Sequence, residues 1–269
     1  MRRIPGLTDF DAMGCYPRFF CRDWTLLQDD LEETGSNLIC LAVVTEPFGS
    51  YDIDHLLRCF KDVVKPYKEH YIVDLSRPLH EIVSRNRRKK AQRALNQLSI
   101  ELCPEPAHMV EEWVSLYRNL IMKHRITGIR KLSVEAFAKQ LSIPGIVMFR
   151  ATHRGVTVGA TLWFVQGDVA YGHLAAFSDT GYDLMASYAL DWYSIRYFAD
   201  SLRWLDFGAG VTNGGNDGLS LYKRGWATGT RTAYLCGRIF NRVRYEEIAE
   251  KKGLGSVNYF PAYRKGEFD

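Results

Sequence analysis

Residues able to act on a charged substrate gather between Arg203 and Gly237 of the 269-residue chain. A short apolar strand is expected at Trp204-Leu205-Asp206-Phe207. Closely spaced glycines follow it, namely Gly208, Gly210, Gly214, Gly215 and Gly218. Tyr222 and Lys223 come next, ahead of Trp226. We predict that this stretch forms one wall of a substrate site. It combines a carboxylate at a strand end, a backbone with few side chains and a Tyr-Lys pair. The alternatives are a carboxylate that caps the loop backbone and a Tyr-Lys pair that only faces solvent.

His173 is a further catalytic candidate, because histidine titrates near neutral pH and can act as a base. It lies within an expected strand, where strict alternation places it on one face with Tyr171 and Ala175. The alternative is a core histidine whose polar atoms are hydrogen-bonded. The other histidines form no group with metal-ligand spacing, so no metal site is predicted.

A run of cations lies between Ser84 and Leu98: Arg85, Arg87, Arg88, Lys89, Lys90 and Arg93. Apolar residues at helical spacing accompany it and indicate a helix with one basic side. Such a helix either faces solvent or binds phosphate groups. In the second case Arg87, Arg88 and Lys89 are the predicted contacts.

The elements that must position these residues alternate in type along the chain. Strands are predicted at 37–44, 70–75, 146–152, 156–165, 169–177 and 204–207, and after Trp226. Helices are predicted at 22–33, 52–64, 84–98, 107–124, 133–141, 180–199 and 240–251, with a loop from Gly208 to Trp226. Short connections at Gly155 and Gly167 make 146–177 an antiparallel meander. We therefore predict a mixed α+β fold, with a small unit at 1–75 and the main domain at 76–269.

Composition narrows the function classes. The net charge is +4, which is too small for the whole molecule to act as a polyanion binder. The six cysteines are scattered, which favours reduced thiols in a cytoplasmic protein over zinc or disulfides. No apolar stretch is long enough for a membrane span, and no signal peptide is expected.

Glycine-rich loops after strands invite a nucleotide-binding interpretation, but two of its forms fail here. The phosphate loop of nucleotide hydrolases requires a Gly-Lys-Ser/Thr sequence that is absent. A dinucleotide loop would need a third small residue where Asn213 stands. Leu205–Gly210 also resembles the first motif of S-adenosylmethionine-dependent methyltransferases. That motif normally opens a sheet, whereas only 59 residues follow Gly210, too few for the remaining strands.

A more specific resemblance joins three segments in order. Leu205-Asp206-Phe207-Gly208 followed by Leu221–Trp226 is similar to a signature of Fem-type acyltransferases, which belong to the GNAT superfamily and include FemAB-like and CelD-like domains. Val73–Leu98 resembles their lead-in to a basic helix, and 155–199 fits the GNAT hairpin and crossover helix. The resemblance covers roughly residues 70–240. It implies a GNAT-like fold whose two central strands diverge, and acyl or aminoacyl transfer to an amine of a small molecule or peptide.

The donor implied by the resemblance is acyl-CoA or aminoacyl-tRNA, with no metal. GNAT proteins hold the CoA pyrophosphate with a glycine-rich loop before the crossover helix. Here Thr180, Gly181 and Tyr182 occupy that place, flanked by Asp179 and Asp183, which oppose a pyrophosphate and favour aminoacyl-tRNA.

The same resemblance assigns roles near the glycine stretch. Tyr222 becomes the candidate acid, Lys223 the group that holds a donor phosphate or the oxyanion, and Asp206 the amine ligand or base. Gly208, Gly210 and Trp226 are the predicted substrate contacts. A different class of function on the same fold is a non-catalytic RNA-binding protein that uses the basic helix, with tRNA as a candidate partner.

Overall fold

The computed structural model describes residues 1–269 except 15–17, 129–130, 212–216, 255–256 and 268–269. Gly214 and Gly215 of the predicted glycine stretch, and Asn213, lie outside the described residues. The chain divides into two compact units: unit 1 comprises Met1–Glu69 and Arg231–Phe268, and unit 2 comprises His70–Thr230. The chain crosses between them within strand β4 (Val63–Asp74) and within strand β10 (Gly229–Ile239). The predicted domains, 1–75 and 76–269, stay a prediction.

Unit 1 contains strands in the order β1-β2-β3-β10, continued by the first residues of β4. Their bounds are Arg2–Arg3 for β1, Phe10–Met13 for β2 and Cys40–Val44 for β3. Helices α1 (Leu27–Thr34) and α2 (Ile53–Cys59) share one apolar cluster with Val43. Helix α10 (Arg242–Lys251) and the short helix Ala262–Arg264 share another with Cys40. Neighbouring positions of β3 thus supply two cores, as a strand buried on both faces does.

The predicted helix 52–64 ends early, and this is a correction. Helix α2 stops at Cys59, and Val63 and Val64 open the long strand β4, which also contains Pro66. Asp62 explains the change, because its N–H donates to Gly237 O and its carboxylate accepts from Ile239 N at 2.6 Å. These bonds to β10 outweigh the apolar helical spacing of the sequence, since tertiary pairing routinely overrides local propensity.

Unit 2 has the strand order β4-β9-β8-β7-β6-β5. The bounds are Trp204–Ala209 for β9, Val169–Phe177 for β8, Val156–Gln166 for β7, Ile146–His153 for β6 and Ser99–Cys103 for β5. Strands β6, β7 and β8 form the predicted antiparallel meander, and β5 adds an edge strand that the sequence analysis missed. The mixed α+β class is confirmed.

Strands β8 and β9 run parallel and pair only at their beginnings. The register runs from Val169 opposite Trp204 to Tyr171 opposite Asp206, and the described pairing stops there. The remaining residues of β8 pair with β7 alone. Asp206 therefore lies where the two strands part, which agrees with the expected divergence.

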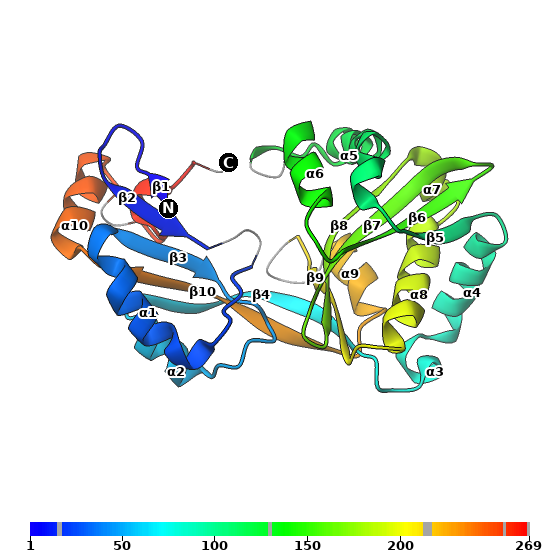
Figure 1. Cartoon of the computed structure of the whole chain (residues 1–269), viewed down its shortest axis with the longest axis horizontal. Helices are drawn as coiled ribbons and strands as arrows, with labels where there is room; N and C mark the ends of the chain where they lie inside the picture. The colour runs from blue at the N-terminus through cyan, green and yellow to red at the C-terminus, as the bar shows by residue number, and fades with distance from the viewer. Residues whose placement is uncertain (15–17, 129–130, 212–216, 255–256, 268–269) are drawn as a thin grey trace. The chain divides into compact units, whose positions relative to one another are not determined.

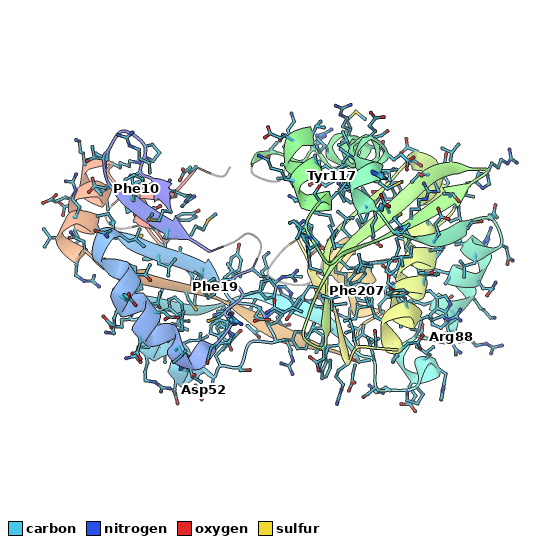
Figure 2. All side chains as sticks on the ribbon, in the orientation of Figure 1. Phe10, Phe19, Asp52, Arg88, Tyr117 and Phe207 are labelled. Atoms are coloured by element: carbon cyan, nitrogen blue, oxygen red, sulfur yellow. The ribbon has the colours of Figure 1, made fainter. Side chains whose placement is uncertain are left out.

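Helices cover both faces of the unit 2 sheet (Figure 1). Helices α4 (Arg85–Leu95) and α8 (Ala186–Ala199) lie side by side on one face with the short α3 (Leu79–Ile82) nearby, and α5 (Val110–His124) and α6 (Val134–Leu141) lie on the other. Phe207 packs into the first layer and Tyr117 into the second (Figure 2). Sheet residues next to each other in sequence, such as Met148 and Phe149, enter opposite cores.

Two further local predictions are wrong. Residues Gly218–Arg224 were expected in a loop but form helix α9, because the Asp217 side chain accepts from Ser220 N and caps it. The crossover helix was expected to begin at Thr180. Instead Ser178 caps the short helix α7 (Asp179–Asp183), and Met185 in a left-handed conformation separates α7 from α8.

Candidate active site

Asp206 and His70 form a buried pair at the end of β9. Asp206 is completely buried, and its Oδ2 lies 2.8 Å from Nδ1 of His70 on β4. Its Oδ1 accepts from Gly208 N at 2.6 Å. Gly208 has φ +74, a conformation that glycine adopts without strain. The carboxylate therefore shapes the tip of β9 and engages an imidazole at the same time.

Lys223 reaches the same tip from helix α9. Its Nζ donates to Ala209 O at 2.8 Å, and a Cβ placed on Gly208 would lie 3.4 Å from this Nζ. Gly210 is tightly packed, since a Cβ there would fall 1.8 Å from Ser220 Oγ. The predicted grouping of Asp206, Lys223, Gly208 and Gly210 in one place is thus observed, whereas their catalytic roles stay predictions.

Tyr222 points from α9 toward α8 and donates its hydroxyl to Asp191 Oδ2 at 2.6 Å. Asp191 is buried, and burial raises its pKa to about 7, although the Tyr222 hydrogen bond and the charges of Lys223 and Arg87 act in the opposite direction. Burial and the Asp191 charge raise the pKa of Tyr222 well above its usual value. The phenol therefore keeps its proton at neutral pH, as the predicted acid requires, but that proton is held by Asp191.

Arg87 is enclosed by aromatic rings, although it was predicted to bind phosphate. Its Cζ lies 5.1 Å from the Trp226 ring centroid, 5.3 Å from Tyr222 and 5.7 Å from Tyr188. A Cβ on Gly225 would fall 1.8 Å from Arg87 Nη2, so the glycine makes room for the guanidinium. Trp226 is completely buried. Both residues link α4 and α8 to α9, and their predicted donor contacts remain untested.

The other two predicted phosphate contacts on α4 differ in exposure. Lys89 is exposed, whereas Arg88 is half-buried and its Nε is buried without a hydrogen-bond partner among the described residues. Exposed cations recur at Arg85, Lys89 and Arg93, four residues apart. Such spacing places them along one side of a helix. They form what we call the α4 basic stripe.

His173 on β8 contacts helix α6 and an aromatic ring of β7. Its Nε2 is 3.0 Å from Gln140 Oε1 on α6, and its ring packs against Phe164. A register shift between β7 and β8 falls at this residue and interrupts the strict alternation that was expected. Tyr171 is buried while Ala175 is exposed, so these two do not share its surroundings. Its neighbour Gly172 lies against Asp206 O, 3.1 Å from the position of a Cβ, and the catalytic role of His173 stays a prediction.

The predicted donor loop forms a closed turn. Gly181 N donates to Ser178 Oγ at 3.1 Å, and a Cβ on Gly181 would fall 2.0 Å from Val158 O of β7. Tyr182 is half-buried under Lys123, whose Nζ lies 4.2 Å from the ring centroid. Lys123 also pairs with Asp179 at 3.2 Å, and Thr180 is exposed.

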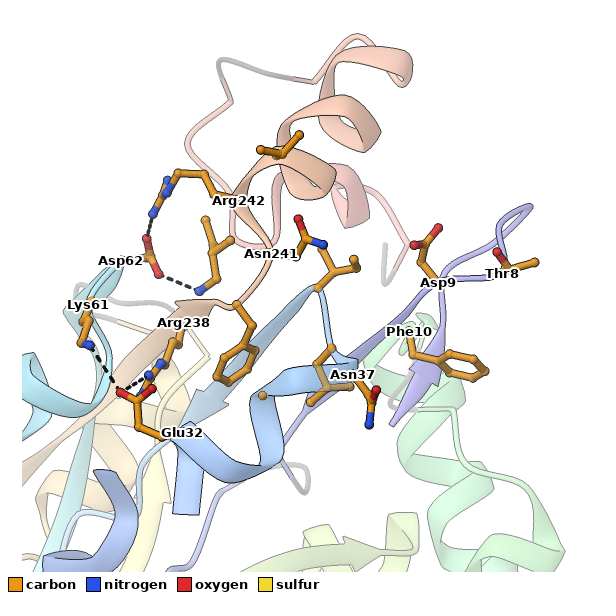
Figure 3. Close-up of a pocket in the computed structure, with 16 residues that line it drawn as sticks. Thr8, Asp9, Phe10, Glu32, Asn37, Lys61, Asp62, Arg238, Asn241 and Arg242 are labelled. Atoms are coloured by element: carbon orange, nitrogen blue, oxygen red, sulfur yellow. Dashed lines mark hydrogen bonds and ion pairs between the residues drawn. The ribbon is translucent and has the colours of Figure 1, made fainter. Parts of the chain in front are cut away.

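Unit 1 contains a separate pocket of about 870 Å³ at the edge of β3 and β10 (Figure 3). Its charged walls are internally paired: Glu32 binds Lys61 and Arg238, and Asp62 binds Arg242. Asn37 and Asn241 add amide groups. The pocket thus offers hydrogen bonds and little net charge, and nothing in the sequence had pointed to it.

The described part of the chain contains no group of three His, Cys, Asp or Glu side chains placed to hold a metal ion. Within the same residues, no helix has the length and apolar character needed to cross a bilayer. The cysteines that the structure describes, Cys21, Cys40, Cys59, Cys103 and Cys236, are free.

The chain belongs to the GNAT acetyltransferase domain family, whose model matches residues 83–224. No curated protein matches it by sequence. Among solved structures it is similar to FemX, with 12% identity over 92% of this chain and 85% of that chain and a TM-score of 0.70. It is also similar to the C-terminal domain of a putative lysylphosphatidylglycerol synthetase from Agrobacterium fabrum, with 14% identity, 80% and 73% coverage and a TM-score of 0.60. At these identities the structures show a shared fold.

The protein is therefore an acyltransferase of the GNAT superfamily with a Fem-type fold, as the resemblance implied. The methyltransferase alternative is wrong, because the matched family includes the LDFG strand within a GNAT domain. Sequence reasoning missed His70 and Asp191. His70 is 136 positions from Asp206 in the chain, and no motif connects them.

Proposed function

We propose that the protein transfers an aminoacyl group from aminoacyl-tRNA to the amine of a small molecule or peptide. The closed turn at Gly181 supports this donor over acyl-CoA. Its glycine N–H is occupied by Ser178 Oγ, and its backbone is packed against Val158 O. A pyrophosphate needs free N–H groups at this place, and the exposed carboxylate of Asp183 would repel it.

The α4 basic stripe is a second observation in favour of an RNA donor. Arg85, Lys89 and Arg93 are exposed cations on one side of a helix that packs beside α8. A row of cations attracts a phosphate backbone without reading its sequence. Arg87, by contrast, packs against three aromatic rings, and it would support the helix that carries Lys223.

Lys223 would polarise the ester carbonyl of the donor. Its ammonium lies at the tip of β9, where it donates to Ala209 O, and a positive charge at this place would stabilise a developing oxyanion. Tyr222 would position α9 through its hydrogen bond to Asp191.

The donor is tested by offering two labelled donors to the same protein. Total tRNA charged with ¹⁴C-amino acids and ¹⁴C-acetyl-CoA are each incubated with hydroxylamine as the amine, and hydroxamate formation above the uncatalysed rate is measured. We expect label from the charged tRNA and none from acetyl-CoA. Transfer from acetyl-CoA alone, with binding that depends only weakly on salt, would contradict the proposed donor. Salt-dependent tRNA binding without any transfer would favour the RNA-binding alternative.

A further inference from the structure

We propose that His70 is the general base of the transfer and that Asp206 orients it. The inference rests on transfer to an amine, which the proposed function includes, but it is independent of the donor. His70 lies on β4 and Asp206 on β9, and Nδ1 of the imidazole is 2.8 Å from Oδ2 of the carboxylate. Asp206 was predicted as the amine ligand or the base, whereas the structure gives it His70 and Gly208 N as partners.

The hydrogen bonds of Asp206 fix the imidazole tautomer. Gly208 N donates to the other carboxylate oxygen at 2.6 Å, which favours the ionised form of Asp206. An ionised carboxylate only accepts hydrogen bonds, so the proton of a neutral His70 must lie on Nδ1. The lone pair then lies on Nε2, the nitrogen that points away from Asp206. This is the arrangement by which a carboxylate prepares a histidine base in hydrolytic triads.

Among the described residues, the side-chain hydrogen bond of His70 is the one between Nδ1 and Asp206, and it does not involve Nε2. The His70 side chain is not sealed, because 9% of its surface remains open, whereas Asp206 has none. A histidine kept only for packing would be expected to have both nitrogens bonded. Here one nitrogen is held and the other is left for a ligand.

His70 and the cation that would stabilise the oxyanion are both placed at Ala209 of β9. In the β4–β9 register His70 is opposite Ala209, and Lys223 Nζ donates to the carbonyl oxygen of that same Ala209. The imidazole of β4 and the ammonium group of α9 are thus both placed at Ala209. At this residue β9 no longer pairs with β8 in the described register. The charged groups that the described residues bring to this region are Asp206 on β9, Lys223 on α9, and Asp217, whose Oδ2 would lie 3.0 Å from a Cβ on Gly210.

The proposed step is balanced without any further reactant. The lone pair of a neutral acceptor amine forms the C–N bond, and the carbonyl electron pair moves to the oxygen beside Lys223. The proton that the new ammonium must lose passes to His70 Nε2. The carbonyl then re-forms as the bond to the leaving oxygen breaks, and that oxygen takes the proton from the imidazolium. His70 is returned to its neutral state.

The tautomer provides a test that needs no substrate. Long-range ¹H–¹⁵N NMR of the ¹⁵N-histidine-labelled protein, with His70→Gln used for assignment, reports which ring nitrogen carries the proton at pH 8. We expect a protonated Nδ1 and a bare Nε2 at His70, and we expect Asp206→Asn to disturb this tautomer. A proton on Nε2 in the unmodified protein would overturn the proposal.

Kinetics separate a base from a packing residue. Transfer is followed to methylamine, whose new ammonium is weakly acidic and needs a base, and to hydroxylamine, whose new ammonium is acidic enough to lose its proton to water. Each is measured with whichever donor the unmodified protein uses. His70→Ala is expected to slow transfer to methylamine by about 10²–10⁴-fold, transfer to hydroxylamine much less, and added imidazole should partly restore the first rate.

His153→Ala is the matched control, because this histidine on β6 bonds only Gln97 O by its Nδ1. We expect it to leave both rates unchanged. If His70→Ala lowers both rates equally and imidazole restores neither, His70 is a packing residue and the proposal is wrong. A wrong assignment of the donor would change which donor is used but leave the tautomer and the ratio of the two amine rates as expected.

Discussion

The ammonium of Lys223 is the positive charge at the tip of β9, and its loss should affect rate far more than stability. Lys223→Ala removes one hydrogen bond to Ala209 O, worth about 1 kcal/mol of unfolding free energy. Loss of an oxyanion ligand typically lowers kcat by about 10²–10³-fold. We expect a fall of this size in single-turnover transfer, with a thermal midpoint within a few degrees of the unmodified protein.

Arg224→Ala is the control for this variant, since Arg224 is the exposed neighbour on the same helix. It should change neither quantity appreciably. A large drop in the thermal midpoint of Lys223→Ala would mean that the lysine is structural and that its proposed role is wrong.

Asp191 should make stability depend on pH. Its pKa is raised to about 7 in the folded protein from an ordinary value of 3.8, so the folded state binds a proton that the unfolded state releases. Stability is therefore highest below the unfolded pKa and falls as pH rises toward 7. Between pH 5 and 8 we expect the difference in unfolding free energy to shift in favour of Asp191→Asn by about 2–3 kcal/mol.

Urea unfolding of both proteins at pH 5 and pH 8 measures this shift. Tyr222→Phe tests the same pair from the other side, because it removes the hydroxyl that stabilises the ionised carboxylate. It should make the fall in stability with pH steeper. An unfolding free-energy difference that does not change with pH would contradict a raised pKa for Asp191.

At the scale of helices, the α4 basic stripe should govern RNA affinity. Replacement of Arg85, Lys89 and Arg93 with Gln removes exposed charge without touching the aromatic enclosure of Arg87. Each lost phosphate contact lowers the slope of log affinity against log salt by about 0.7–0.9. We expect weaker binding of charged tRNA and a slope reduced by about 2, measured by filter binding at several salt concentrations.

Gln substitutions at Arg118, Lys131 and Lys139 give a control with the same change of net charge. These residues are exposed on or near α5 and α6, which lie on the other face of the sheet. An equal loss of affinity in both triple variants would show that net charge, not the stripe, sets binding.

Close packing at Gly181 should make the turn intolerant of a side chain. A Cβ there would meet Val158 O at 2.0 Å, and backbone cannot move aside cheaply. Gly181→Ala should lower the unfolding free energy by about 1–3 kcal/mol, as overpacking does. Gly218→Ala, at the start of α9 with nothing within 4 Å, should be neutral or slightly stabilising. If urea unfolding shows both variants equally stable, the turn is more open than described.

The sequence predicted elements well where one pattern dominated. Continuous apolar runs and short turns predicted β6, β7 and β8. The predicted helix at 107–124 is observed as α5, Val110–His124. Local pattern failed where distant bonds decided the structure, as in β4, where Asp62 and β10 replaced a helical turn with a strand. Helix α9 was not predicted because glycines in and before it indicate a loop, although Asp217 and Ser220 form its N-terminal cap.

About half of the residues of the candidate site could be grouped from the sequence. Asp206, Gly208 and Lys223 stand close together in sequence and could be grouped by their spacing. His70 and Asp191 reach the same region from a strand and a helix far away in the chain, so only the fold could place them. Arg87 was identified as a cation, but burial between rings cannot be read from a basic run.

At the scale of the whole molecule, the C-terminal segment should stabilise unit 1 specifically. Arg264 is almost completely buried and binds both oxygens of the buried Asp11 on β2, at 2.5 and 2.8 Å. Arg264→Met leaves Asp11 without this partner, which typically costs about 3–5 kcal/mol. We expect hydrogen exchange to lose protection in residues 1–69 and 231–267 while residues 70–230 keep theirs.

Arg244→Met is the comparison, because its pair with Asp9 is partly exposed and worth about 0–1 kcal/mol. It should leave exchange nearly unchanged in both units. Uniform loss of protection along the whole chain in Arg264→Met would show that the two units unfold as one.

The central claim is that acyl transfer takes place at the tip of β9, between His70 and Lys223. A crystal structure with a non-hydrolysable donor, an amino acid joined by an amide to the 3′ end of a short acceptor-end RNA, tests it most directly. The account predicts the amide oxygen within about 3 Å of Lys223 Nζ and the acyl carbon facing His70 Nε2. An acyl group bound away from this tip, with Lys223 still on Ala209 O and His70 facing no ligand, would contradict it.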